Sequence, residues 1–353
     1  MSFVLSAASM FRSNLPSSLI VFFAVAFGGG AHAQTPIKFL LDGKIDGTTT
    51  PFLLAIDKGY FRAEGIDVTI LEPTPPDQGD GAQETIKRVA AGEAEMGFGD
   101  INAMIRFRDQ NPQMPVKAVY IVYNKAAYSI VGRKSRDVVY PKDLEGKKLG
   151  APPRDASFAV WKAFVSANAL DETKITIENI GMPVREPMLA AGQVDAVTGL
   201  SFLSYINLKD RGVPPNDITV MLMADYGVDL YGNAIVVNAK FANENPELVK
   251  AFLRAFTKGL KDTLAKSSSA IDSVIKRNET LRKDLELERL KMAIRDNILT
   301  PEVKANGFGA VVPQRFAKAI DVLATTYPFK QKPDPADLFD ASFLPSATLR
   351  KAN

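Results

Sequence analysis

The chain has 353 residues, 43 basic and 40 acidic side chains, a formal net charge of +3, no cysteine and one histidine, His32. This nearly balanced charge, with no basic run, excludes the electrostatic footprint of a nucleic-acid-binding protein. The missing thiols exclude disulfides, cysteine-based zinc sites and Cys-His nucleophiles. We therefore predict no catalytic residue, no metal site and no cofactor, and the composition favours a binding protein over an enzyme.

The first 33 residues have the features of a cleaved secretory signal peptide. Arg12 supplies the positive charge, residues 19–27 (LIVFFAVAF) form the apolar stretch, and residues 31–33 match an A-x-A cleavage site. The apolar stretch is too short to span a bilayer, which argues against an uncleaved membrane anchor. We therefore expect export to a periplasm with cleavage after Ala33, whether translation starts at Met1 or at Met10. Cleavage would leave about 320 residues without any histidine, enough for two lobes.

Strands and helices alternate after this leader. Apolar or alternating stretches predict strands, and helical spacing behind a capping residue predicts helices. Hydroxyls at 48–50 with Pro51, and Asp100, are good capping residues at two of the helix starts. The first unit has predicted strands at 37–41, 66–71, 96–99 and 116–123, and predicted helices at 51–59, 83–91 and 101–109.

A second unit repeats the same order. Its predicted strands are 128–131, 147–151, 174–177, 195–198, 218–223 and 234–237, with helices at 156–170 and 183–191. Trp161, the only tryptophan, lies among apolar residues in the first of these helices, which predicts a place in the core. Long amphipathic helices follow at 246–264, 279–299 and 312–324, and their charged positions are predicted to be solvated faces. Strand–helix alternation predicts α/β units with mainly parallel sheets and helices on both faces.

Five stretches carry a family resemblance. Residues 51–70, PFLLAIDKGYFRAEGIDVTI, resemble the opening signature of the SsuA/THI5-like (NMT1-type) family. Four more stretches follow in the family's order, and the resemblance covers residues 36–265. These stretches are AAGEAEMGFGD at 90–100, YPKDLEGKKLGAP at 140–152, AAGQVDAVTGL at 190–200 and ENPELVKAFLRAFTKG at 244–259.

The resemblance implies a type II periplasmic-binding-protein fold, which is α/β with two lobes, a cleft and two hinge crossovers. Lobe I would hold residues 34–124 and 232–353, and lobe II residues 125–231, with hinge strands near 123–126 and 231–235. Bacterial members are mostly substrate-binding proteins of ABC importers, which pass alkanesulfonates, taurine, nitrate, aromatic acids or pyrimidine precursors to a permease and its ATPase. We expect a monomer that captures a small organic solute by hinge closure.

Two alternatives come from enzyme chemistry. Eukaryotic members of the family make the thiamine pyrimidine from pyridoxal phosphate and their own histidine, and they carry a cysteine-rich motif. This chain has no cysteine and would lose His32 with its leader, which argues against a synthase but leaves a salvage binder for the same pyrimidine open. A hydrolase built on serine and lysine is disfavoured because the sequence contains no G-x-S-x-G motif.

The candidate ligand-binding residues come from the loops that follow the strands. In open α/β sheets, ligands bind beyond the carboxyl ends of the strands. The family resemblance implies Asp100, Ile101 and Asn102, because the position after the strand at 96–99 lines the ligand pocket in that family. The full predicted set is Lys44, Asp46, Thr48, Thr49, Thr50, Asp100, Ile101, Asn102, Tyr123, Arg154, Asp155, Ser157, Ser201, Tyr226, Tyr231 and Asn233.

The charge of the solute is left open by these residues. Arg154, in a strand-to-helix loop, offers a guanidinium for a carboxylate or sulfonate, but it is equally typical of a solvated loop arginine. The hydroxyls at 48–50 either hold an anion at a helix start or cap that helix. Asp46 and Asp100 point instead to an amine or aminopyrimidine, although Asp100 also suits a simple helix cap.

We predict that Arg154→Ala weakens the binding of an anionic solute by about 1.5–3 kcal/mol, the range for hydrogen bonds to charged groups. Isothermal titration calorimetry of the mature protein measures this loss. An unchanged affinity would remove Arg154 from the site.

Overall fold

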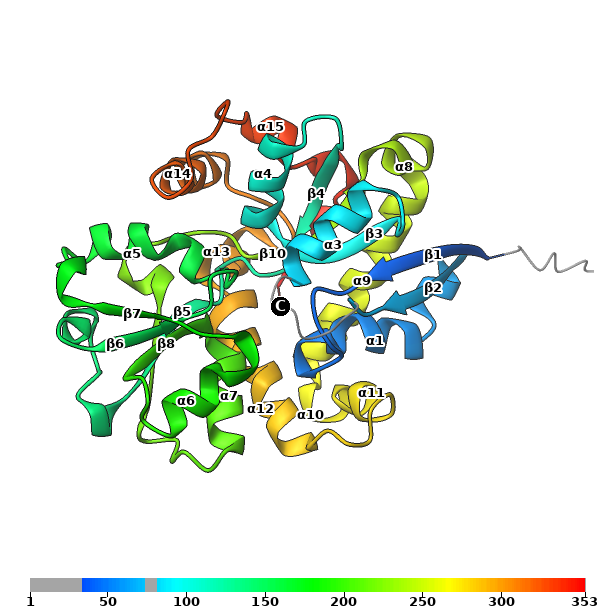
Figure 1. The fold of residues 1–353 in the computed structure, drawn as a ribbon. Coiled ribbons are helices and arrows are strands. Elements are labelled where there is room, and N and C mark those ends of the chain that lie inside the picture. Colours follow the sequence, from blue (N-terminus) through cyan, green and yellow to red (C-terminus); the bar gives the residue numbers. More distant parts are fainter. Residues whose placement is uncertain (1–33, 74–80, 353) are drawn as a thin grey trace, which may run out of the picture. The chain divides into compact units, whose positions relative to one another are not determined.

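Two five-stranded sheets organise the chain (Figure 1). The computed structural model describes residues 34–73 and 81–352, so the predicted signal peptide at 1–33 lies outside the described residues. The strands predicted from the sequence are all present, with ends that differ by a few residues. The α/β class is therefore confirmed.

The first sheet has the order β2-β1-β3-β10-β4. β1 pairs in parallel with both β2 and β3, whereas β10 runs antiparallel to β3 and β4. Its strands are β1(Thr35–Leu40), β2(Ile66–Leu71), β3(Met96–Asp100), β4(Val116–Ile121) and β10(Asn233–Asn238).

The second sheet has the equivalent order β7-β6-β8-β5-β9. β6 pairs in parallel with β7 and β8, and β5 runs antiparallel to β8 and β9. Its strands are β5(Tyr128–Arg133), β6(Lys148–Ala151), β7(Thr176–Asn179), β8(Ala196–Leu200) and β9(Ile218–Leu222). Both sheets are thus mixed rather than simply parallel, because β5 and β10, the strands that follow each chain crossing, enter in the reverse direction.

Helices follow the strands as the alternation predicted. Those between the strands are α1(Thr50–Asp57), α2(Tyr60–Ala63), α3(Gly81–Ala90), α4(Ile101–Gln110), α5(Trp161–Ala167), α6(Arg185–Ala190) and α7(Ser201–Asp210). Those after β10 are α8(Ala239–Glu244), α9(Pro246–Ala265), α10(Ser267–Ala270), α11(Asp272–Ile275), α12(Lys283–Ala293), α13(Pro301–Asn306), α14(Pro313–Ala324), α15(Pro335–Leu338) and α16(Ala347–Arg350). None of the helices that the structure describes combines the length and apolarity needed to cross a bilayer.

Short helical turns complete the connections. A π-helical turn, η8(Ile294–Ile298), extends α12, so the predicted helix at 279–299 is shorter and ends irregularly. The 3₁₀ turns are η1(Gly47–Thr49), η2(Lys134–Arg136), η3(Pro141–Leu144), η4(Phe158–Val160), η5(Glu172–Lys174), η6(Met182–Val184), η7(Met223–Tyr226) and η9(Ala341–Phe343).

Stacked phenylalanines join the first sheet to its helices. Phe39 of β1 lies 5.1 Å, ring to ring, from Phe252 of α9, and Phe52 of α1 lies 4.4 Å from Phe256. All four side chains are almost completely buried. Offset aromatic pairs add about 0.5–1.5 kcal/mol each beyond the apolar area they bury. This packing fixes α1, and with it the loop that leads into α1 from β1.

Trp161 is buried in the second sheet's core, as predicted. Its side chain is 3% exposed, its ring stacks on Phe164 at 5.9 Å, and its Nε1 donates to Glu172 at 2.8 Å. A buried indole N–H needs such an acceptor. Trp161 therefore serves the core rather than a binding surface.

Two chain crossings join the sheets and are hydrogen-bonded to each other. The Gly232 N–H donates to the Tyr123 carbonyl at 2.8 Å, and the Ala126 N–H donates to the Leu230 carbonyl at 2.9 Å. A Cβ at Gly232 would lie 2.9 Å from the Cα of Ala126, so the crossings approach too closely for any side chain there. The lobe boundaries predicted next to these crossings stay a prediction.

Gly259 offers a test of the packing between α1 and α9. A Cβ there would lie 2.5 Å from the Pro51 carbonyl oxygen and 2.6 Å from the Ala55 Cβ. We expect Gly259→Ala to lower the free energy of unfolding by about 1–3 kcal/mol, the usual cost of overpacking, despite the better helix propensity of alanine.

Urea unfolding of the mature protein measures this change. Gly181→Ala is the control, because its Cβ would meet its nearest neighbour at 3.8 Å, an ordinary contact. Equal stability of the two variants would contradict the close packing of α1 on α9.

Candidate functional site

A cavity of about 550 Å³ lies where the carboxyl ends of both sheets face each other, and we call it the cleft. Its walls come from the loop after β1, from α4, from the segment after β6, from η6 and α6, and from α7 and α12. Small-molecule sites typically have volumes of about 300–1,000 Å³. The cleft therefore has the size of a site for one small organic molecule.

Hydrogen bonds from its own side chains fix the conformation of the loop after β1. Asp46 accepts hydrogen bonds from the Thr48 N–H at 2.8 Å and from the Thr48 hydroxyl at 2.6 Å. The Thr49 and Thr50 hydroxyls donate to the carbonyls of Asp46 and Gly47. Asp46, rather than a threonine, thus caps the turn η1, while the threonine hydroxyls secure the backbone of the loop.

Asp42, directly after β1, is a carboxyl group in the cleft that the sequence analysis did not single out. Asn233 of β10 donates its side-chain N–H to the Asp42 carboxylate. Burial and the neighbouring Asp46 raise the pKa of Asp42 to about 7. Asp42 can therefore be a carboxylic acid or a carboxylate near neutral pH. Its place directly after a buried strand was the signal that could have identified it.

On the side of the second sheet, the wall of the cleft is built around Arg185 of α6. This side chain is 2% exposed, and its Nη1 donates to Asp155 at 2.9 Å, while its Nε donates to Glu186 at 2.8 Å. The other Asp155 oxygen accepts the N–H groups of Ser157 and Phe158. Asp155 thus both caps a helical turn and orients Arg185, a cleft residue that the sequence analysis missed.

A second buried arginine, Arg289, reaches the cleft from α12. It donates to both carboxylate oxygens of Glu286, at 2.9 and 3.2 Å, and its Nε lies 3.8 Å from Asp46. Charged positions of this helix were predicted to be solvated, and for these two residues that prediction is wrong: Arg289 is 6% and Glu286 is 4% exposed. The cause is tertiary, since α12 packs against η1 and α7.

Two hydrogen-bond donors in the wall of the cleft are unsatisfied within the described residues. Nη1 of Arg289 and Nη1 of Arg106, on α4, are buried and have no hydrogen-bond partner in the part of the chain that the structure describes. Both arginines line the cleft. Buried polar groups are normally hydrogen-bonded, so these donors are available to a polar group that enters the cleft.

Apolar and aromatic surface forms the rest of the wall. Tyr123 lies edge-on to Phe202 at 5.9 Å, and Leu203, Met182 and Leu281 extend this surface. Arg154 also lines the cleft, but it is exposed and has no partner among the described residues. The arrangement can hold a largely apolar or aromatic body with a few polar edges.

The cleft brings together only part of the predicted ligand-binding set. The predicted residues that line it are Lys44, Asp46, Thr48, Thr49, Tyr123, Arg154 and Asp155. The predicted residues that the structure does not place in its wall are Thr50, Asp100, Ile101, Asn102, Ser157, Ser201, Tyr226, Tyr231 and Asn233. A ligand-binding role of either group stays a prediction.

Internal contacts explain several of the residues outside the cleft wall. Asp100 caps α4, accepting from Asn102 N–H at 2.6 Å, and it also accepts from the Tyr128 hydroxyl. The Asn102 side chain donates to the Tyr231 carbonyl at 2.7 Å, and the Tyr231 hydroxyl donates to Glu302 at 2.9 Å. These side chains stabilise the region where the two crossings meet the first sheet.

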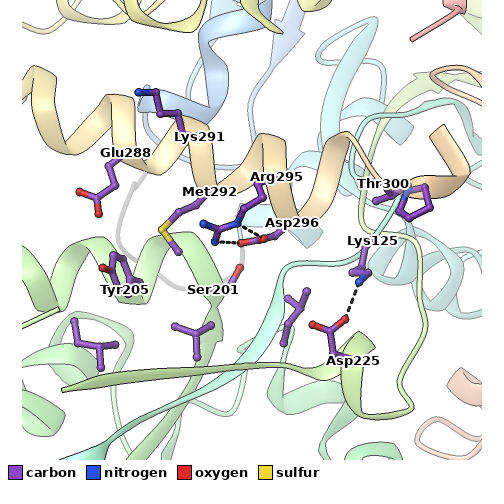
Figure 2. Close-up of a pocket in the computed structure, with 14 residues that line it drawn as sticks. Lys125, Ser201, Tyr205, Asp225, Glu288, Lys291, Met292, Arg295, Asp296 and Thr300 are labelled. Atoms are coloured by element: carbon purple, nitrogen blue, oxygen red, sulfur yellow. Dashed lines mark hydrogen bonds and ion pairs between the residues drawn. The ribbon is translucent and has the colours of Figure 1, made fainter. Parts of the chain in front are cut away.

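Ser201 lies in a second cavity of about 630 Å³, on the other side of α7 and α12 (Figure 2). In this view Ser201 and Tyr205 of α7 face Met292 and Arg295 across the cavity. Two ion pairs lie within it: Lys125 with Asp225 at 2.7 Å, and Arg295 with Asp296 at 2.6 Å. Two of its cations, Lys125 and Arg295, are thus paired with carboxylates.

Asp42 makes the stability of the protein depend on pH. Because its pKa is raised from 3.8 to about 7, the folded protein binds this proton more tightly than the unfolded chain does. Its contribution to stability therefore falls as pH rises from about 4 to about 7. We expect Asp42→Asn, which keeps an acceptor for Asn233, to gain stability relative to the native protein between pH 5 and pH 8.

Urea unfolding at these two pH values measures the gain. Asp67→Asn, at an exposed position on β2, is the control and should leave the pH dependence unchanged. A difference between native protein and Asp42→Asn that does not grow with pH would contradict the buried carboxyl.

Comparisons with known proteins agree with this architecture. A family model described as NMT1/THI5 like matches residues 47–270. The Escherichia coli periplasmic aliphatic sulphonate-binding protein SsuA superposes with a TM-score of 0.66 at 13% identity, over 86% of this chain and 91% of that chain. This likeness confirms the predicted periplasmic-binding-protein fold.

Curated relatives include binding proteins and enzymes. Riboflavin-binding protein RibY of Chloroflexus aurantiacus is 27% identical over 63% of this chain, and the match spans only 60% of RibY. A formylaminopyrimidine-binding protein of Halalkalibacterium halodurans is 26% identical over 69% of this chain and 71% of its own. The Saccharomyces cerevisiae 4-amino-5-hydroxymethyl-2-methylpyrimidine phosphate synthase THI13 is 25% identical over 70% of this chain and 73% of its own.

Proposed function

The chain belongs to the NMT1/THI5-like family, and from that premise we propose that it is the solute-binding component of an ABC importer. It captures one small organic molecule in the cleft and delivers it to a permease. The observation that carries this proposal is the cleft, a cavity of about 550 Å³ lined by segments that follow strands of both sheets. Its wall contains buried donors that have no partner among the described residues. Solved relatives with this fold, such as SsuA, are periplasmic binding proteins.

The proposed solute is a nitrogen heteroaromatic molecule of the pyrimidine or flavin type. Two binding-protein relatives are named for riboflavin and for a formylaminopyrimidine, which share such rings. The wall formed by Tyr123, Phe202 and Leu203 suits the flat face of a ring. Asp42 and Asp46 offer acceptors for ring N–H or amino groups, which supports this class over an alkanesulfonate that lacks an amino group.

Capture proceeds by hinge closure around the two crossings. Lobe I holds residues 34–124 and 232–353, and lobe II residues 125–231. The crossings are short and hydrogen-bonded to each other, which suits a hinge that absorbs rotation over a few residues. The protein acts as a periplasmic monomer after removal of residues 1–33, and its partners are the permease and ATPase subunits.

A second candidate is a pyrimidine synthase, which the match to THI13 supports. According to the family resemblance, such synthases consume a histidine of their own and carry a cysteine-rich motif. This chain has no cysteine, and its one histidine, His32, belongs to the predicted signal peptide. Binding without turnover is therefore the favoured function.

Two residues on one helix test the function and the place of binding together. Leu203 and Tyr205 are both half-buried on α7, but Leu203 lines the cleft and Tyr205 lines the second cavity. We expect a riboflavin or formylaminopyrimidine probe to bind the mature protein. Leu203→Ala should weaken that binding by about 10- to 100-fold, because one apolar side chain contributes on the order of 1.5–3 kcal/mol.

Titration calorimetry with both probes, taurine and an alkanesulfonate measures these affinities, and Tyr205→Ala is the matched control. A loss in Tyr205→Ala with none in Leu203→Ala would move the solute to the second cavity. No binding of any probe to the native protein, once it has been unfolded and refolded to release co-purified solute, would contradict the function.

A further inference from the structure

The cleft has a wall that lies beyond the family match. That match ends at residue 270, yet Asn278, Leu281, Glu286 and Arg289 line the cleft from the segment 271–293. Two faces of α12 serve different cavities: Glu286 and Arg289 line the cleft, whereas Glu288 and Met292 line the second cavity. Figure 2 shows Glu288 and Met292 at the second cavity. The contribution of α12 to the cleft is therefore a feature of this chain that the family comparison does not cover.

Arg289 is fixed in position before any solute arrives. Its Nε and Nη2 both donate to Glu286, and Glu286 in turn accepts the Gly47 N–H at 2.7 Å. A Cβ at Gly47 would lie 2.1 Å from the Glu286 carbonyl oxygen, so α12 is seated directly on the loop after β1. The guanidinium thus cannot turn away from the cleft without breaking this contact.

Nη1 is the one nitrogen of this guanidinium that does not donate to Glu286. Nη1 is buried and has no hydrogen-bond partner in the described residues, although Arg289 as a whole is only 6% exposed. An unsatisfied buried donor lowers the stability of the folded protein, and more so when it is charged. An acceptor on the solute would remove that cost, so Nη1 favours solutes that carry one.

The charge around Nη1 decides what kind of acceptor is preferred. Glu286 already neutralises the guanidinium through two hydrogen bonds, and the Asp46 carboxylate lies 3.8 Å from Nε. The three side chains together carry no net positive charge. An anion placed at Nη1 would meet two carboxyl groups in a poorly solvated site, whereas a carbonyl oxygen would gain the hydrogen bond without that repulsion.

We propose that Arg289 is a specificity-determining residue whose Nη1 donates to an uncharged carbonyl or amide oxygen of the solute, while Glu286 and Asp46 exclude anions from that position. This inference rests on the proposed function and deepens it, because it selects among solutes of one shape by charge. It concerns a residue of α12, outside the matched family region.

A pair of probes with equal shape and different charge tests this proposal. Pyrimidine-5-carboxamide presents a neutral oxygen where pyrimidine-5-carboxylate presents an anionic one. We expect the native protein to bind the carboxamide at least tenfold more tightly. Arg289→Lys should weaken the carboxamide by about 10- to 100-fold, because a lysine cannot keep the fork to Glu286 and also reach the solute.

Two further variants separate recognition from folding. Arg295→Lys, in η8 at the second cavity, is the control for the same substitution away from the cleft, and it should change neither affinity. Glu286→Gln keeps an acceptor for the Gly47 N–H but removes one negative charge, so it should shift the preference toward the carboxylate by about tenfold or more. Thermal unfolding without solute verifies that each variant is folded.

The outcomes distinguish this inference from the proposed function. The role of Arg289 is overturned if the native protein binds the carboxylate as tightly as the carboxamide or more tightly. It is also overturned if the protein binds a sulfonate and neither probe. Both results would leave the proposed function standing. An unchanged carboxamide affinity in folded Arg289→Lys would do the same. Failure of every probe and every solute in the native protein would contradict both.

Discussion

The contact of Glu286 with the Gly47 N–H is the interaction on which the cleft depends. It joins residues 239 positions apart in the sequence and seats α12 on the loop that carries Asp42 and Asp46. Without it, the cleft would lack one wall and the β1–α1 loop would lose its outer support. Only glycine suits position 47, because α12 backbone occupies the space of a side chain there. A hydrogen bond and a missing Cβ thus connect the N-terminal binding loop to the C-terminal helices.

Charge pairing inside the wall shapes what the cleft can recognise. Arg185 is paired with Asp155, and Arg289 with Glu286, so these two buried cations already have carboxylate partners. Buried charges need such partners because their desolvation is expensive. In the proposed function, a solute would meet these neutralised arginines and much apolar surface, together with Arg106 and Arg154 and with specific donors and acceptors such as Arg289 Nη1 and Asp42. Recognition by hydrogen-bond pattern and shape follows from this arrangement more readily than recognition by charge alone.

The C-terminal segment also braces the chain crossings. Asn124 accepts from the Thr300 hydroxyl at 2.6 Å and donates to Glu302 at 2.7 Å, and the Lys125 N–H donates to the Asn297 carbonyl at 3.1 Å. The same segment, through α12, touches the cleft on one face and the second cavity on the other. Residues after 270 therefore connect the wall of the cleft to the two crossings, by packing and hydrogen bonds that run along one continuous stretch of chain.

The sequence by itself determined the strands, the order of the elements, the fold class and two of the segments that line the cleft, those after β1 and β6, because period, caps and family motifs are local signals. It also located Asp46, Arg154 and Asp155 in segments that line the cleft. Only the tertiary structure decided that Arg185, Glu286 and Arg289 are buried there, since an amphipathic pattern shows that a face is covered but not by what. The tertiary structure alone also assigned Asp100 to internal contacts, because a helix cap and a ligand contact require the same side chains, and their surroundings decide between the two.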